Sequence, residues 1–171
     1  TEWEGFETAT RAAASGGITT LVDMPLNSTP VTTTVKNLKA KLDAAAGKLY
    51  VDCGFWGGIV SGDTSNLEPL INAGVMGFKA FLTHSGIEDF PNTSLKDLEK
   101  SAAILKKFNL PLLAHAELDT KHNGLKAFDE DPESYKAFLA SRPRTWEDEA
   151  VKELIALCEK TKVRVHVVHL S

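Results

Sequence analysis

The feature that most constrains this chain is a repeated alternation of helical segments with short, nearly continuous apolar runs. Strands that are apolar along their whole length are buried on both faces, which is typical of a parallel sheet covered by helices. The order helix then strand occurs five times and therefore predicts an α/β fold. The five expected strands are residues 18–24, 49–60, 75–82, 110–117 and 163–170.

Helical periodicity is clearest after Ser94, where Leu95, Leu98, Ala102 and Leu105 form one apolar stripe. Each of the other strands is also preceded by a segment with helical character. The expected helices are residues 2–15, the second half of 31–47, 65–74, 94–109 and 146–160, the last capped by Thr145 after a polar excursion over 118–144.

The first helix is expected to begin at the first residue. Thr1 and Glu4 have the spacing of a capping box, in which the two side chains satisfy exposed backbone N–H groups. Trp3, Phe6 and Ala13 would then face a core. A chain that opens directly on a helix and closes on a strand is expected to be a piece of a longer protein.

Two architectures place helices over a parallel sheet: a doubly wound open sheet and a (β/α)8 barrel. No G-x-G-x-x-G motif follows any expected strand, so the dinucleotide-binding form of the open sheet has no support. A complete barrel needs eight strands and about 250 residues. Five strands in 171 residues would form part of a barrel.

Composition excludes several classes of function. Hydrophobic residues make up 43% and charged residues 25%, which is typical of a globular chain. The net charge of −4, with no block of like charges, argues against binding to nucleic acid or to an anionic membrane. No apolar run approaches the roughly 18 residues that span a bilayer. Two cysteines and no visible signal peptide lead us to expect a cytoplasmic protein.

Polar residues stand near the carboxyl ends of the expected strands, where both architectures collect functional groups. These residues include Lys79, His115 with Glu117, and His169. A lysine among apolar neighbours either reaches solvent, pairs with a carboxylate, or is activated because burial lowers its pKa. A single strand histidine is more often a hydrogen-bonded core residue than a ligand, but two of them beside a buried lysine favour a metal site.

The remaining reactive residues have simpler interpretations. Asp23 is expected to cap the turn before Pro25, and His122 is expected to be solvated. His166 should point to the opposite face from His169, because side chains alternate along a strand. The cysteines Cys53 and Cys158 have no basic neighbour in sequence and are expected to be small core residues.

Five segments carry distinctive motifs: GGITTLVDMPLNSTP (16–30), GVMGFKAFLTHSG (74–86), PLLAHAE (111–117), SRPRTWEDEAV (141–151) and VHVVHLS (165–171). Together they resemble one family, the allantoinases, in the cyclic-amide branch of the amidohydrolase superfamily beside dihydroorotase and the hydantoinases. A strand lysine followed by two strand histidines is shared across the branch, whereas DMPLNS and SRPR-x-WE-x-EA point more narrowly to allantoinase.

The resemblance implies a fold and an assembly. The family fold is a (β/α)8 barrel with a flanking β-sandwich, and the five strands here would be the second to the sixth of the barrel. Residues 1–171 would then be a single segment of the catalytic domain, without the first strand, the last two strands and the sandwich. The whole protein would be a homo-oligomer, a tetramer in many members.

The resemblance also implies a site with two divalent metal ions. Zinc is the expected metal, with manganese, cobalt or iron as alternatives. Lys79, carboxylated by CO2, would bridge the two ions, and His115 and His169 would bind the second. Asn27 and Ser85 would contact the substrate. A His-x-His pair before the segment and a general-base aspartate after it would complete the site, so no catalytic residue is expected within these residues.

The implied function is hydrolysis of the ring amide of allantoin to allantoate, a step of purine breakdown. With three of the six ligands, the segment alone is expected to be inactive. The alternatives are a dihydroorotase- or hydantoinase-type cyclic amidase and a non-catalytic scaffold protein of the same superfamily. The expected partner is therefore a small molecule.

Overall fold

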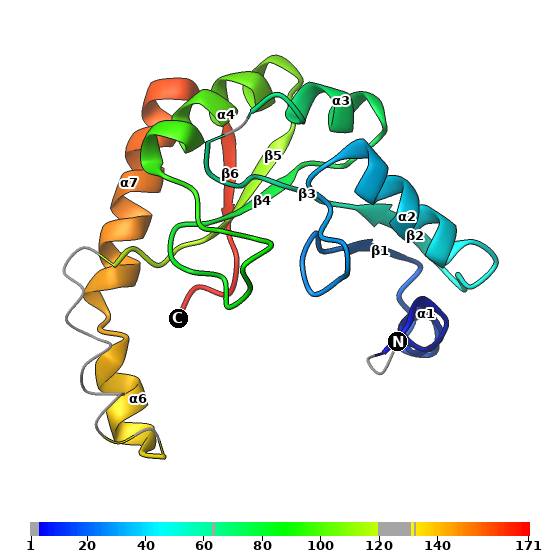
Figure 1. The fold of residues 1–171 in the computed structure, drawn as a ribbon, viewed down its shortest axis with the longest axis horizontal. Coiled ribbons are helices and arrows are strands. Elements are labelled where there is room, and N and C mark those ends of the chain that lie inside the picture. Colours follow the sequence, from blue (N-terminus) through cyan, green and yellow to red (C-terminus); the bar gives the residue numbers. More distant parts are fainter. Residues whose placement is uncertain (1–3, 63, 120–130, 132) are drawn as a thin grey trace.

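The structure is a computed structural model and describes residues 4–62, 64–119, 131 and 133–171 (Figure 1). Strands and helices alternate as the sequence predicts. The strands are β1 (Thr20–Asp23), β2 (Asp52–Phe55), β3 (Gly57–Gly58), β4 (Phe78–Phe81), β5 (Pro111–His115) and β6 (Arg164–Val167). The helices are α1 (Phe6–Ser15), α2 (Val35–Ala45), α3 (Leu67–Asn72), α4 (Leu95–Lys107), α6 (Tyr135–Ser141) and α7 (Thr145–Thr161).

All of the strand pairs are parallel, as expected, and follow one another in chain order. β1 pairs with β2, and β3, β4, β5 and β6 form a second sheet in that order. The expected strand over 49–60 is divided at Trp56, whose N–H donates to the carbonyl of Asp23 at 2.9 Å. No described strand reverses the order, whereas a doubly wound sheet contains such a reversal.

The helices form an outer layer over the strands. Figure 1 shows α2, α3, α4 and α7 on one side, with the loops after β1 and β4 on the other, and helices that follow one another in this layer contact each other. Among the described residues, no helix is both long and apolar enough to cross a bilayer.

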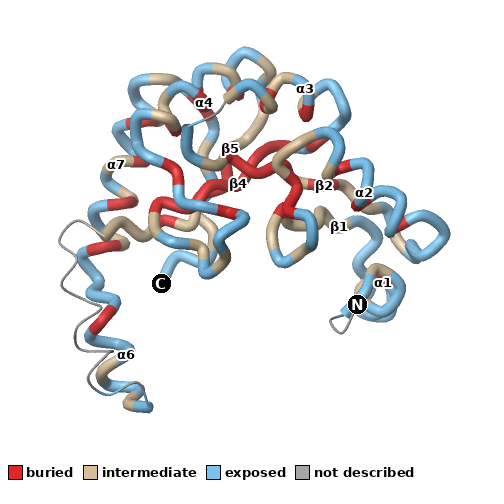
Figure 2. Tube along the Cα trace, in the orientation of Figure 1, coloured by how far each residue is buried: buried red, intermediate tan, exposed pale blue. Residues whose placement is uncertain are grey.

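The main core lies between the strands and these helices. Alternate residues of the two central strands, Phe78 and Ala80 of β4 and Leu112 and Ala114 of β5, are fully buried against it. Figure 2 shows the buried stretches along β4 and β5. Because alternate residues of a strand point to opposite faces, the intervening residues of β4 and β5 face the other side of the sheet.

Helix α4 confirms its sequence pattern. The Ser94 hydroxyl caps the helix by accepting the N–H of Asp97 at 3.1 Å. Leu98, Ala102 and Leu105 are buried in the core. Leu95, the fourth member of the predicted stripe, remains 37% exposed.

The first helix begins later than predicted. It starts at Phe6 with Gly5 at its N-cap, so Glu4 lies outside the helix and the predicted capping box is wrong. Phe6 packs on the core and meets Phe55 edge to face, with ring centroids 6.1 Å apart. The fully buried member of this helix is Thr10, whose hydroxyl donates to the carbonyl of Phe6 at 2.6 Å. Thr1 and Trp3 lie outside the described residues.

The start of α7 and the segment before it also differ from the prediction. Thr145 does not cap α7 but lies in its first turn, where Glu147 and Asp148 place negative charge at the positive end of the helix dipole. The predicted polar excursion contains the short helix α6, capped by the Ser134 hydroxyl. A helix of 7 residues within a polar stretch is too short to be recognised from its hydrophobic periodicity.

The strand predicted over 18–24 is less buried than its composition indicates. β1 lies at the edge of the described strands, and Ile18 before it is 51% exposed. Cys53 of β2 and Cys158 of α7 are half-buried free thiols. Burial raises the pKa of the Cys53 thiol, which fits the predicted unreactive role.

Candidate metal centre

The candidate centre lies on the face of the sheet that is turned away from the helices. The register aligns Lys79 of β4 with Gly58 of β3 and with Leu113 of β5, so Lys79 lies in the middle of this face. Gly58 leaves room for the Phe90 ring, since a Cβ at this glycine would come within 2.4 Å of that ring. Phe90 also packs edge to face on Phe81, and the second apolar cluster, Val31 with these two phenylalanines, covers this part of the sheet.

Lys79 is buried beneath this cover, with 5% of its surface exposed. Its ammonium nitrogen lies 4.7 Å from the centroid of the Phe81 ring. Among the described residues, no hydrogen bond or ion pair accompanies this contact. Lys79 is therefore buried without pairing with a described carboxylate, and burial lowers its pKa.

The structure brings His115 and His169 into direct contact. His115 ends β5 and stacks on the Phe81 ring, with centroids 4.7 Å apart. His115 Nδ1 lies 3.2 Å from His169 Nε2. The Phe81 ring thus contacts both Lys79 and His115, and it is the residue that links Lys79 to the histidine pair on this face.

His169 reaches this position because the strand ends before it. β6 stops at Val167, and His169 adopts a left-handed backbone conformation with φ of 48°, which is uncommon for a residue other than glycine. His166 pairs in register with Leu113, which lies on the same face as Lys79. The prediction that His166 and His169 point to opposite faces is therefore wrong, because strand alternation does not extend to His169.

The geometry of the two histidines fits a metal ion. His115 Nε2 lies 2.9 Å from Glu117 Oε2, which leaves Nδ1 as the nitrogen that can bind a metal. Metal-binding histidines usually donate their other N–H to a carboxylate in this way. The 3.2 Å between Nδ1 and Nε2 is close to the separation of about 3.3 Å between two nitrogens bound to one tetrahedral zinc ion.

Glu117 joins the site to a more distant segment. The hydrogen bond with His115 lowers the pKa of the Glu117 carboxyl, and the neighbouring Arg142 guanidinium, which donates to the same oxygen, lowers it further. The sequence pattern identified Glu117 at a strand end without assigning it a role and left Arg142 unassigned. The i, i+2 spacing of His115 and Glu117 is the one signal that pointed to their contact.

Asn27 and Ser85 both lie in loops. Asn27 is exposed in the loop after β1 and has a left-handed φ of 56°. The Ser85 hydroxyl donates to the carbonyl of Phe90 at 2.6 Å and accepts the N–H of Ile87 at 3.3 Å. These bonds hold the loop that carries Phe90, and the role of Asn27 and Ser85 in substrate binding stays a prediction.

The Asp23 carboxylate forms an ion pair with a buried lysine. It accepts a hydrogen bond of 2.6 Å from the buried Lys41 Nζ, which also donates to the carbonyl of Met24 at 2.7 Å. Asp23 therefore ties the end of β1 to α2, in place of the predicted turn cap. His122, predicted to be solvated, lies outside the described residues.

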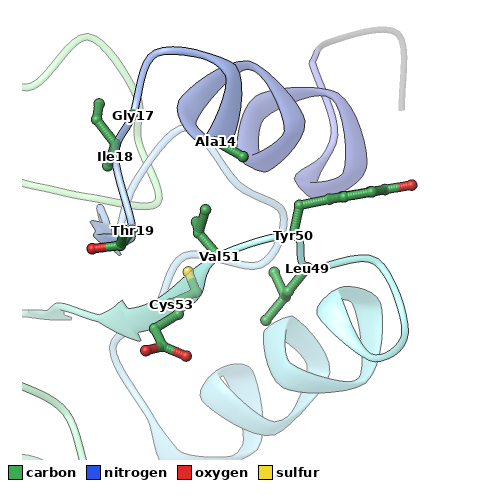
Figure 3. Close-up of a pocket in the computed structure, with 9 residues that line it drawn as sticks. Ala14, Gly17, Ile18, Thr19, Leu49, Tyr50, Val51 and Cys53 are labelled. Carbon is green, nitrogen blue, oxygen red and sulfur yellow. The ribbon is translucent and has the colours of Figure 1, made fainter.

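A hollow of about 620 Å³ lies at the other end of the strands (Figure 3). It opens where α1 approaches the amino ends of β1 and β2, whereas the candidate ligands stand near the carboxyl ends of their strands. Within the part of the chain that the structure describes, no group of three histidine, cysteine or acidic side chains is arranged around a metal position. The hollow is lined by Ala14, Gly17, Ile18, Thr19, Leu49, Tyr50, Val51, Asp52 and Cys53.

Comparison with known proteins relates the whole length of the chain to one family. The model of the amidohydrolase family matches residues 1–171. The chain is 52% identical to an allantoinase of Streptomyces avermitilis over 171 residues, covering 100% of this chain and 38% of the relative. It is 44% identical to an allantoinase of Arabidopsis thaliana over 180 residues, covering 99% of this chain and 36% of the relative.

Solved structures agree with this relationship. The L-hydantoinase (dihydropyrimidinase) of Arthrobacter aurescens superposes with a TM-score of 0.89 at 29% identity, over 97% of this chain and 37% of that chain. A D-hydantoinase of Bacillus sp. AR9 superposes with a TM-score of 0.82 at 27% identity, over 98% of this chain and 37% of that chain. The chain therefore spans little more than a third of the length of the proteins it matches.

Proposed function

The chain belongs to the amidohydrolase family, which confirms the resemblance drawn from its motifs, and we propose that it forms part of an enzyme that hydrolyses the ring amide of allantoin to allantoate. The observation that carries the proposal is the pair of facing nitrogens on His115 and His169, with Lys79 buried beside the same aromatic ring. Identities of 44% and 52% with allantoinases over essentially the whole chain support this choice of substrate.

We propose that residues 1–171 are one segment of a (β/α)8 barrel, with the strands taking the second to sixth positions. Two observations support this proposal: the parallel strands follow chain order, and the helices form one outer layer. The superposition on L-hydantoinase supports it as well. The remaining strands and the β-sandwich would come from outside this segment.

The proposed centre holds two divalent metal ions, with zinc as the expected metal. His115 and His169 would bind one ion, and Lys79, as a carbamate, would bridge both. When bound at these residues, the metal would supply hydroxide at neutral pH and would polarise the ring carbonyl. Burial lowers the pKa of Lys79 and so favours the neutral amine, whose nitrogen would attack CO2 and lose a proton to form the anionic carbamate.

The other residues of this chain would hold that arrangement. Glu117 would accept the Nε2–H of His115, which turns Nδ1 toward His169 Nε2 and the proposed metal position. The cluster of Val31, Phe81 and Phe90 would shield Lys79 on the side where its nitrogen meets the Phe81 ring. The general base would be an aspartate outside the segment.

Hydantoin or dihydropyrimidine hydrolysis is the second candidate. It is favoured by the structural likeness to proteins named L-hydantoinase (dihydropyrimidinase) and D-hydantoinase, although identity to them is 27–29%. We also propose that the whole protein is a homotetramer in the cytoplasm. The free thiols Cys53 and Cys158 are compatible with a reducing compartment.

A substrate assay on the full-length, zinc-loaded protein tests the function. We expect turnover of allantoin, with hydantoin and dihydroorotate hydrolysed at least 100-fold more slowly. Preference for hydantoin would favour the second candidate, and metal binding without turnover of any cyclic amide would favour a non-catalytic protein. Analytical ultracentrifugation of the same sample measures the oligomeric state.

A further inference from the structure

Two contacts between residues far apart in the sequence hold the segments that carry the two histidines. Both are made by residues at the start of α7. Arg142 lies just before this helix and Glu147 lies in its first turn. Each contacts a residue two positions beyond one histidine in sequence: Glu117 follows His115, and Ser171 follows His169.

The first contact holds His115. Arg142 Nη1 donates to Glu117 Oε2, the same oxygen that lies 2.9 Å from His115 Nε2. The Glu117 side chain is 15% exposed and that of His115 is 22% exposed, whereas Arg142 reaches them from a more open position at 45%. The N–H of Leu118, next to Glu117, also donates to the carbonyl of Trp146 at 3.0 Å.

The second contact holds the turn that carries His169. Glu147 Oε1 accepts the backbone N–H of Ser171 at 3.0 Å, and Oε2 accepts its hydroxyl at 2.8 Å. Val168, just after β6, still donates its N–H to the carbonyl of Ala114 in β5 at 3.0 Å, but residues 169–171 make no backbone hydrogen bond to a described residue of β5. Glu147 therefore holds the chain just beyond the left-handed turn at His169.

We propose that Arg142 and Glu147 are positioning residues of the metal centre: Arg142 orients His115 through Glu117, and Glu147 orients His169 through Ser171. This inference rests on the proposed function, because it assumes that the two histidines bind a metal. A carboxylate on the second N–H of a histidine fixes its tautomer and ring orientation and raises its basicity. The SRPRTWEDEA segment thereby gains a physical role in the site.

Arg142→Met tests the first contact in the full-length protein, and Arg144→Met is the matched control. Arg144 is also an arginine at the start of α7 and is exposed. We expect Arg142→Met to weaken binding of Zn2+ and Co2+ by about 10-fold, the lower end of the effect of losing a direct partner of a metal ligand, because Arg142 acts through Glu117. The control should show no such loss. Affinity is measured by competition with a chromogenic chelator, without reference to turnover.

Glu147→Ala tests the second contact, and Asp148→Ala is its control in the same helix turn. Glu147→Gln should restore metal affinity, because its amide oxygen accepts the Ser171 N–H and its NH2 group can donate to the hydroxyl. The visible spectrum of the Co2+-loaded protein reports the ligand geometry, which a general loss of stability would leave unchanged. We expect altered bands in Arg142→Met and Glu147→Ala and the parent spectrum in both controls.

Two results overturn the inference. One is affinity within twofold of the parent together with an unchanged Co2+ spectrum in Arg142→Met and Glu147→Ala. The other is an equal loss of affinity in the control variants. If the parent binds metal but hydrolyses no cyclic amide, the proposed function fails while the positioning roles are still measured. If the parent binds no metal, both proposals fail.

Discussion

Lys41 and Lys79 are the two buried lysines among the described residues, and they differ in the partners of their charged nitrogens. Lys41 donates to the carboxylate of Asp23 and to a backbone carbonyl, so its charge is satisfied. Lys79 meets an aromatic ring and no described anion. A buried cation without an anion costs stability, and proteins retain such residues chiefly where they serve a site.

The two lysines should therefore respond differently to the same change. In the metal-free, full-length protein, Lys41→Met should lower the free energy of unfolding by about 1–3 kcal/mol, because it leaves Asp23 without its partner. Lys79→Met should leave it unchanged or raise it, since it removes an unpaired amine from an apolar site.

Urea unfolding measures both variants in the presence of a chelator. Lys79→Met should also reduce the metal content of the purified protein, measured by elemental analysis, whereas Lys41→Met should not. A Lys79→Met variant that is strongly destabilised without metal would show that Lys79 has a structural partner.

At the scale of elements, side chains at a helix end hold neighbouring segments together through hydrogen bonds. The carboxylate of Asp97, in the first turn of α4, accepts hydrogen bonds from Ser94, Lys100, Ser61 and the N–H of Gly62. The bond from Lys100 contributes most, and together these donors hold the pKa of Asp97 well below its usual range. This one side chain thus links the loop after β3 to the start of α4.

The stability contributed by Asp97 should depend on pH in a defined direction. Because its pKa is lowered in the folded state, the contribution is complete above the ordinary value of 3.8 and is lost as pH falls further. Asp97→Asn should lower the Tm by a few degrees at pH 7, and its difference from the parent should shrink below about pH 4.

Thermal unfolding of parent and variant from pH 7 to pH 2.5 makes this measurement. Asp89→Asn, in an exposed loop position, serves as the control. A difference between parent and Asp97→Asn that stays constant down to the lowest pH would contradict the assigned role.

At the scale of the whole molecule, the 171 residues hold one part of the proposed centre. His115, His169 and Lys79 are present, whereas the resemblance places the other ligands outside the segment. β1 has one described strand partner, β2, so it presents an unpaired edge together with exposed apolar residues such as Ile18. Unpaired edges of this kind promote association between chains.

The segment expressed alone should therefore self-associate, bind fewer than two metal ions tightly and show no turnover of allantoin. Sedimentation velocity, metal analysis and an allantoin assay test the three statements. Measurable turnover by the purified 171-residue chain would contradict the expectation that residues outside it complete the site.

The sequence alone predicted the alternation of helices and parallel strands, because this pattern depends on local hydrophobic periodicity. It also predicted the apolar surroundings of Lys79, since its chain neighbours are themselves strand residues. The caps were less predictable: the capping box of Thr1 and Glu4 and the cap at Thr145 were both wrong, because a cap depends on where the backbone turns.

Only the tertiary structure decided how the candidate ligands meet. His169 faces His115 because β6 ends early and the backbone turns left-handed, which strand alternation cannot anticipate. Arg142 reaches Glu117 across 25 residues of sequence, and Glu147 reaches Ser171 across 24. Periodicity reports the face of one element, whereas these contacts depend on the register between strands and on the path of the chain between elements.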